Sequence, residues 1–327
     1  MPDCCGMGLV AYCLGIHQRE RKAGTGARDA HDAVGFLEAC RDFGAGGVQF
    51  PFGGGGEASV RPVREAAERH GLHVEAIVAL PKGDNDVGRF EKELSTARAA
   101  GATVARTVML PGRRYEQFKT REAFAEACAS GLEALERAEP IARRIGVRLA
   151  VENHKDHRAD EKIDVLKQLD SEYVGACVDF GNNLALAEDP LEVVRALAPW
   201  ALTAHIKDHA VRECPEGFWM TDVALGEGLL DLPAMVGAIR KARPAARFNL
   251  EVITRDPILV PALTPGYRET FADLGDEEID RTMALVRSRG ARESLVMVSA
   301  LSVAEQVALE RHNVERSVRY ARERLGI

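Results

Sequence analysis

Aromatic residues are scarce in this chain and make up only 6% of its 327 residues. Proteins that bind single-stranded nucleic acid stack the bases on aromatic side chains, so this composition disfavours that class. Positive charge is also in short supply, because 43 Lys and Arg face 50 Asp and Glu and give a net charge of −7. A surface that neutralises phosphates is therefore not expected, and we predict no nucleic-acid partner.

Long apolar runs are absent as well. None approaches the roughly 20 residues that a membrane-spanning helix needs, and no basic segment followed by a long apolar stretch opens the chain. The seven cysteines form no CxxC pair and their number is odd, which is untypical of a disulfide framework. These absences predict a cytoplasmic protein with no membrane partner.

Two nucleotide-binding signatures are missing too. The glycine run 53–56 is not followed by Lys-Ser or Lys-Thr, so it is not a P-loop. No glycine fingerprint follows the first expected strand, which argues against an open, doubly wound sheet that binds a dinucleotide. With 46% hydrophobic and 28% charged residues, the composition is that of a globular protein that can bury a sizeable core.

Short β-rich runs alternate with longer helical stretches along most of the chain. Strands are expected at 8–15, 47–50, 73–80 and 103–110 and in four later apolar runs. Helices are expected at about 31–43, 59–70, 87–100, 121–145, 161–169, 190–197 and 232–241. Strict alternation predicts a parallel sheet with helical crossovers. Eight such units predict an α/β fold, the (β/α)₈ TIM barrel.

The C-terminal part of the chain has a different pattern. We assign residues 1–275 to the barrel, which forms the catalytic domain, and residues 276–327 to a C-terminal helical extension. Its two helices are expected at about 277–288 and 303–325. Such an extension packs on its own barrel or on a partner subunit, so a homo-oligomer is a reasonable expectation.

Four apolar runs each end in a residue that can bind a metal. They run into Glu152, Asp179, His205 and Glu251, in steps of 27, 26 and 46 residues. One βα unit of a barrel takes roughly 30 residues, so these side chains are expected at the ends of successive strands. Barrel enzymes build their sites at that face. Three carboxylates and one imidazole suit Mn²⁺, Mg²⁺ or Zn²⁺.

With these four residues at the ends of its expected strands, the chain resembles the xylose-isomerase-like TIM-barrel superfamily, also called the sugar phosphate isomerase/epimerase family. The resemblance covers roughly residues 8–260 and is most specific between residues 151 and 251. In sugar-acting members, Glu, Asp, His and Glu at these strand ends hold one divalent ion. The resemblance therefore implies one such cation here, with Mn²⁺ the first choice and Mg²⁺, Zn²⁺ or Co²⁺ the alternatives.

The sequence departs from some branches of that family at Asn182. Type IV apurinic endonucleases carry a zinc-binding histidine three residues after the strand-six aspartate, and Asn182 occupies this position here. A trinuclear zinc site would thus be incomplete. Ketose epimerases often place a substrate-holding histidine at the same position. The Lys207-Asp208 pair after His205 is similar to the dehydratase and isomerase branches.

The metal ligands define a reaction type. A divalent ion polarises a carbonyl or hydroxyl oxygen, and a carboxylate then removes the neighbouring proton to give an enediolate. We predict a sugar isomerase or epimerase acting on a keto-sugar or cyclitol, with Glu152 and Glu251 as the catalytic carboxylates. A lyase or dehydratase of keto-glycoside or inosose type shares the same intermediate and stays open. An apurinic endonuclease-like hydrolase and a non-catalytic sugar-binding protein are less favoured.

Further polar residues are expected to contact a small sugar or keto-sugar substrate. Side chains two positions apart on an extended strand point the same way, so residues near Glu152 and His205 are the first candidates. The predicted substrate-binding residues are His154, Lys207, His17, Asn182 and Arg255. Arg106, within the fourth expected strand, is expected to pair with Glu75, since a buried charge without a partner is costly.

Overall fold

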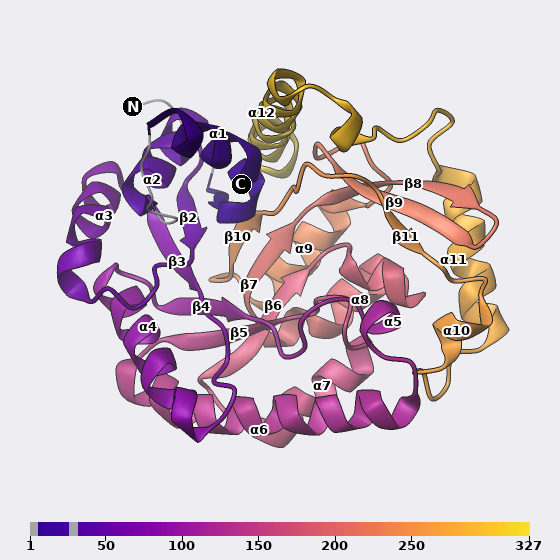
Figure 1. The fold of residues 1–327 in the computed structure, drawn as a ribbon, viewed down its shortest axis with the longest axis horizontal. Coiled ribbons are helices and arrows are strands. Elements are labelled where there is room, and N and C mark those ends of the chain that lie inside the picture. The colour runs from indigo at the N-terminus through magenta and orange to yellow at the C-terminus, as the bar shows by residue number, and fades with distance from the viewer. Residues whose placement is uncertain (1–5, 26–31) are drawn as a thin grey trace.

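The computed structural model describes residues 6–25 and 32–327, and eight of its strands close into a parallel barrel (Figure 1). Their order around the barrel is β1-β10-β7-β6-β5-β4-β3-β2, which confirms the predicted TIM barrel. The barrel strands are β1 (Gly8–Val10), β2 (Gly47–Phe50), β3 (His73–Ile77), β4 (Val104–Thr107), β5 (Arg148–Glu152), β6 (Val174–Asp179), β7 (Ala201–Ile206) and β10 (Arg247–Leu250).

Helices lie outside the strands and cover the barrel (Figure 1). They are α1 (Gly15–Thr25), α2 (Ala33–Asp42), α3 (Glu57–His70), α4 (Val87–Ala99), α5 (Arg114–Gln117), α6 (Arg121–Ile145), α7 (Ala159–Leu169), α8 (Pro190–Leu197) and α9 (Leu232–Ala242). Gly71 and Gly146 end α3 and α6 in the left-handed conformation, which glycine adopts without steric cost. Pro190 opens α8 as predicted, and Asp189 caps it.

The N-terminal segment differs from the expectation of a strand at 8–15. The strand ends at Val10, and the 3-10 turn η1 (Ala11–Leu14) leads directly into α1. Ala11, Cys13 and Leu14 are buried, so burial does not alternate as it would along a strand. Helix α2 begins at Ala33, and residue 31 of the predicted helix lies outside the described part.

A second sheet, which the sequence did not lead us to expect, lies beyond β7. Strands β8 (Asp208–Cys214), β9 (Gly217–Val223) and β11 (Ile258–Val260) pair antiparallel in the order β11-β9-β8. It covers a separate apolar cluster that includes Phe218, Met220 and Val260. The sheet lies between α12 and α11 in Figure 1.

The C-terminal helices follow α10 (Pro265–Arg268) and agree with their predicted positions. They are α11 (Asp276–Arg289) and α12 (Val303–Tyr320), the latter ending in a π turn, η6 (Ala321–Leu325). Helix α12, yellow in Figure 1, lies beside α1, and the Glu310 carboxylate accepts the N–H groups of Ile16 and His17 at 2.8 Å each. The extension thus contacts the barrel of its own chain, while the domain boundary at residue 275 stays a prediction.

No helix within residues 6–25 and 32–327 combines the length and the apolar character that crossing a bilayer requires.

Candidate metal centre

The predicted metal-binding side chains converge at the carboxyl ends of four strands. Glu152, Asp179 and His205 lie at the ends of β5, β6 and β7, and Glu251 follows β10 directly. Each offers one ligand atom, and these atoms all lie within 4.8 Å of one another. His205 Nδ1 is 3.6 Å from Glu152 Oε2, 3.9 Å from Asp179 Oδ2 and 3.5 Å from Glu251 Oε1. The barrel therefore gathers side chains that are up to 99 residues apart in sequence.

The orientation of the His205 ring suits a metal ligand. Its Nε2 donates to Gln49 Oε1 at 2.7 Å, and the Gln49 amide in turn donates to Glu75 Oε2 at 3.1 Å. This chain fixes the proton on Nε2 and leaves Nδ1 facing the carboxylates. Nδ1 is buried and has no hydrogen-bond partner among the described residues. A buried nitrogen without a partner, surrounded by three carboxylates, fits a divalent cation.

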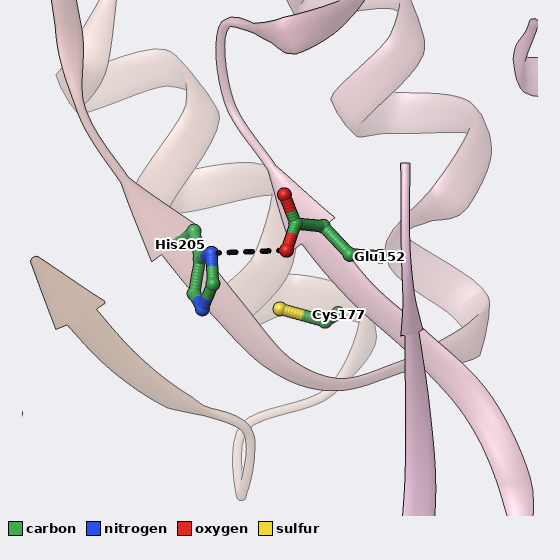
Figure 2. Close-up of side chains that lie close together, drawn as sticks. All are labelled: Glu152, Cys177 and His205. Atoms are coloured by element: carbon green, nitrogen blue, oxygen red, sulfur yellow. Dashed lines mark ion pairs between the residues drawn. The ribbon is translucent and has the colours of Figure 1, made fainter. Parts of the chain in front are cut away.

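Cys177 lies beside Glu152 and His205, and its sulfur faces both side chains (Figure 2). Burial raises the pKa of this thiol to about 11, so it stays protonated at neutral pH. In the sequence, Cys177 belongs to the apolar run that ends at Asp179 and does not stand out as a polar residue. The period of a strand could have revealed it, because Cys177 is two residues before Asp179 and points to the same side.

Arg106 and Asn182 hold the Glu152 carboxylate. Arg106 forms an ion pair with Glu152 Oε2, and Asn182 Nδ2 donates to Glu152 Oε1 at 2.9 Å. Burial alone would raise the pKa of Glu152, but the Arg106 guanidinium, together with His154 and His205, opposes this and the pKa is lowered. The side chain is therefore ionised at neutral pH, ready to bind a cation or accept a proton.

The predicted pairing of Arg106 with Glu75 is wrong. In the barrel register Arg106 lies opposite Ile77 of β3, which is two residues closer to the carboxyl end of that strand than Glu75. Glu75 Oε2 instead accepts hydrogen bonds from Gln49, Thr203 and Asn249, between 2.9 and 3.1 Å. Glu75 thus belongs to a buried polar layer below the metal centre.

Lys207 bridges two of the candidate ligands. Its Nζ lies 2.7 Å from Asp179 Oδ2 and 2.6 Å from Glu251 Oε2. Burial would raise the pKa of Glu251, but the Lys207 ammonium opposes this and holds the pKa well below its usual value. Three buried carboxylates in this small space thus already attract a positive charge.

The other predicted substrate-binding residues differ in how close they lie to the candidate metal ligands. His154 follows Glu152 in the loop after β5, and its Nδ1 is buried without a partner among the described residues. Asn182 contacts Glu152 directly, as described above. Arg255, partly buried after β10, lies close enough to affect Lys155 electrostatically. His17 sits in α1 and is tied through its backbone N–H to Glu310, at 2.8 Å. Within the described residues, no hydrogen bond or ion pair joins the His17 side chain to the four candidate ligands.

Lys155 is a site residue that the sequence reasoning missed. It follows Glu152 by three positions, is only 5% exposed, and its Nζ donates to Asn182 Oδ1. The backbone has φ 66°, a left-handed conformation that is unusual for a residue other than glycine. In the sequence, Lys155 is marked only by its position in a loop after a barrel strand. Surface loops commonly carry lysines, so this position does not identify it as a site residue.

Comparison with known families agrees with the fold. A model described as the xylose isomerase-like TIM barrel matches residues 37–289, and the chain belongs to this family. Two curated proteins are similar over shorter segments. The 3-oxo-isoapionate decarboxylase of Pectobacterium atrosepticum is 33% identical over 103 residues, which are 31% of this chain and 38% of that protein. The uncharacterised YihM of Escherichia coli is 25% identical over 91 residues, 28% of each chain. The aligned segments thus span less than two fifths of either relative.

Solved structures share the architecture at low sequence identity. A D-psicose 3-epimerase structure has a TM-score of 0.60 at 14% identity, covering 91% of this chain and 95% of that one. An L-ribulose 3-epimerase has a TM-score of 0.58 at 15% identity, covering 98% and 96%. These similarities support the fold of the whole barrel.

Proposed function

We propose that this protein is a divalent-metal-dependent enzyme that isomerises or epimerises a keto-sugar or cyclitol. The observation that carries the proposal is the convergence of Glu152, Asp179, His205 and Glu251 within 4.8 Å of one another. Membership of the xylose isomerase-like family and the likeness to two sugar 3-epimerases support the substrate class. The oxygen-rich ligand set favours Mn²⁺, with Mg²⁺, Zn²⁺ or Co²⁺ as alternatives.

The chemistry is divided between the cation and the two glutamates. When bound, the divalent ion would polarise a substrate oxygen and acidify the neighbouring C–H. Glu152 and Glu251, both ionised at neutral pH, are the groups that would accept this proton and leave an enediolate. Return of the proton to the opposite face or to the adjacent carbon gives the epimer or the isomer. Arg106 and Lys207 contact these carboxylates and keep them ionised between turnovers.

A second candidate is a lyase on the same site. The segment similar to 3-oxo-isoapionate decarboxylase favours it, at 33% identity over 103 residues. A dehydratase removes the same proton and then breaks a carbon–oxygen bond, so that water leaves. A decarboxylase breaks a carbon–carbon bond in place of the C–H bond. For a 3-oxo acid, CO₂ leaves, the electron pair stays in the enolate, and a proton taken from water through a carboxylate of the site is added to carbon.

Proton exchange with the solvent distinguishes these reactions. We would incubate the Mn²⁺-loaded protein with a panel of keto-sugars, cyclitols and keto-sugar acids in D₂O and follow the substrates by NMR. Deuterium at carbon with all carbon–carbon and carbon–oxygen bonds retained supports the isomerase or epimerase. Release of CO₂ or water supports the lyase. If neither the metal-loaded nor the chelated protein converts any member of the panel or exchanges its protons with the solvent, the metal-dependent proposal is wrong.

A further inference from the structure

Lys155 is a buried cation without a counter-ion. Within the described residues no carboxylate lies within ion-pair distance of its Nζ, although the side chain is only 5% exposed. Its hydrogen-bond partner is the neutral Asn182 Oδ1. Burying an ammonium away from any carboxylate is unfavourable, and proteins retain such a group mainly where it has a function.

A second ammonium points at the same amide oxygen. Lys207 Nζ lies 3.5 Å from Asn182 Oδ1, so Lys155 and Lys207 converge on one neutral acceptor. Lys207 is compensated by Asp179 and Glu251, whereas Lys155 is not. The charged groups that act on Lys155 are Lys207, Asp179, Arg255 and Asp222. Burial, followed by the charge of Lys207, lowers the pKa of Lys155 to about 8, so most of it remains cationic at pH 7.

The chain holds Lys155 in place through its backbone. Its φ of 66° is strained for a lysine, and its carbonyl accepts the N–H of Arg114 at 2.9 Å. The following Asp156 accepts the N–H groups of His154 and His157 at 3.0 and 2.8 Å. The loop is therefore rigidly organised and presents the ammonium next to the metal centre rather than to solvent.

We infer that Lys155, together with Lys207, binds an anionic group of the substrate, and that the substrate is a carboxylate-bearing keto-sugar rather than a neutral ketose. A substrate carboxylate next to Asn182 would supply the counter-charge that Lys155 lacks. Arg255 adds positive charge from the loop after β10. This inference rests on the proposed function, because it assigns a substrate class to the same site.

The test compares two ligands that differ mainly in one carboxylate. Isothermal titration calorimetry of the Mn²⁺-loaded protein would measure binding of D-fructuronate, which has a carboxylate at C6, and of D-fructose. We expect the wild-type dissociation constant to be at least tenfold lower for the keto acid. Lys155→Met should weaken keto-acid binding at least tenfold more than it weakens D-fructose binding, whereas Lys155→Arg should retain part of the preference. Lys241→Met, at an exposed lysine of α9, is the matched control and should match wild type.

Equal affinity of the wild type for the two ligands would overturn the inference, and this comparison requires no variant. A preference that persists in folded Lys155→Met would overturn the role of Lys155. The proposed function fails separately: absence of solvent exchange with any ligand contradicts the enzyme proposal, while a preference for the keto acid still supports the anion site. Solvent exchange with D-fructose and no preference for the keto acid contradicts only the anion site.

Discussion

Glu152 interacts with three other side chains of the metal centre. It faces His205, forms an ion pair with Arg106 and accepts a hydrogen bond from Asn182. Glutamine has nearly the same shape but can neither accept the substrate proton nor neutralise a cation. We therefore expect Glu152→Gln to lower the rate of solvent exchange into substrate by about a thousandfold or more.

The exchange rate would be measured by NMR and the folded state by circular dichroism. Glu133→Gln, at an exposed position of α6, is the control and should keep full activity. A folded Glu152→Gln protein that retains turnover would contradict the assigned mechanism.

The pKa of Lys155 predicts a pH dependence for anion binding. Its folded-state pKa of about 8 lies below the ordinary value of 10.5, so the cationic form is lost as the pH rises through 8. Binding of D-fructuronate should therefore weaken between pH 7 and pH 9, by up to tenfold per pH unit above 8. Calorimetry at a series of pH values measures this change. In Lys155→Met the decline should be absent, and an identical decline in that variant would assign it to another group.

For single residues, the sequence predicts the candidate metal ligands better than the side chains that contact them. Glu152, Asp179, His205 and Glu251 could be recognised because each ends an apolar run at a spacing typical of a barrel. The partners of Arg106 depend on strand register and side-chain direction, which no local pattern encodes. The same holds for Lys155, whose placement depends on an unusual backbone conformation.

Among the elements, the barrel strands were predictable and the additional sheet was not. The strands of the barrel are short, buried and followed by helices, and this alternation is visible in the sequence. Strands β8 and β9 follow β7 with no helix between them, so the alternation of strands and helices does not predict them. Helix α1 was also missed, because its sequence is mostly polar and few apolar residues mark its face.

The loop after β9 depends on one buried carboxylate. Asp208 accepts the backbone N–H groups of Gly226, Gly228 and Leu230, between 3.0 and 3.1 Å. Asp208→Ala would leave these donors without a partner, so we expect the free energy of unfolding to fall by about 3 kcal/mol. Urea unfolding followed by circular dichroism measures the loss.

Two further variants make the Asp208 prediction specific. Asp208→Asn keeps one acceptor oxygen and should lose less stability. Gly228→Ala should also destabilise the loop, because a Cβ there would lie 2.2 Å from Asp208 Oδ1. A change below about 1 kcal/mol in Asp208→Ala would show that water replaces the carboxylate.

At the scale of the whole molecule, closure of the barrel brings together four candidate metal ligands that are far apart in the sequence. The ligand-bearing strands β10, β7, β6 and β5 are consecutive around the barrel, so the four side chains share one end of it. The C-terminal extension contacts α1 and lies on the barrel, while a homo-oligomer remains a prediction for measurement in solution.

A cation that binds only the folded barrel must stabilise it. At a free Mn²⁺ concentration a hundred times the dissociation constant, the free energy of unfolding should rise by about 2.7 kcal/mol. Thermal unfolding with and without Mn²⁺ measures the effect, and a chelator should reverse it. His205→Ala should lose most of this stabilisation. A melting temperature that does not respond to Mn²⁺, Mg²⁺, Zn²⁺ or Co²⁺ would contradict a metal centre.

The most direct measurement is anomalous diffraction from crystals of this protein grown with Mn²⁺. A single strong anomalous peak should lie among Glu152, Asp179, His205 and Glu251, within bonding distance of all four side chains. The same crystals should show Lys207 displaced from the carboxylates of Asp179 and Glu251. No peak at this position in crystals saturated with Mn²⁺, or a peak bound by other residues, would contradict the account.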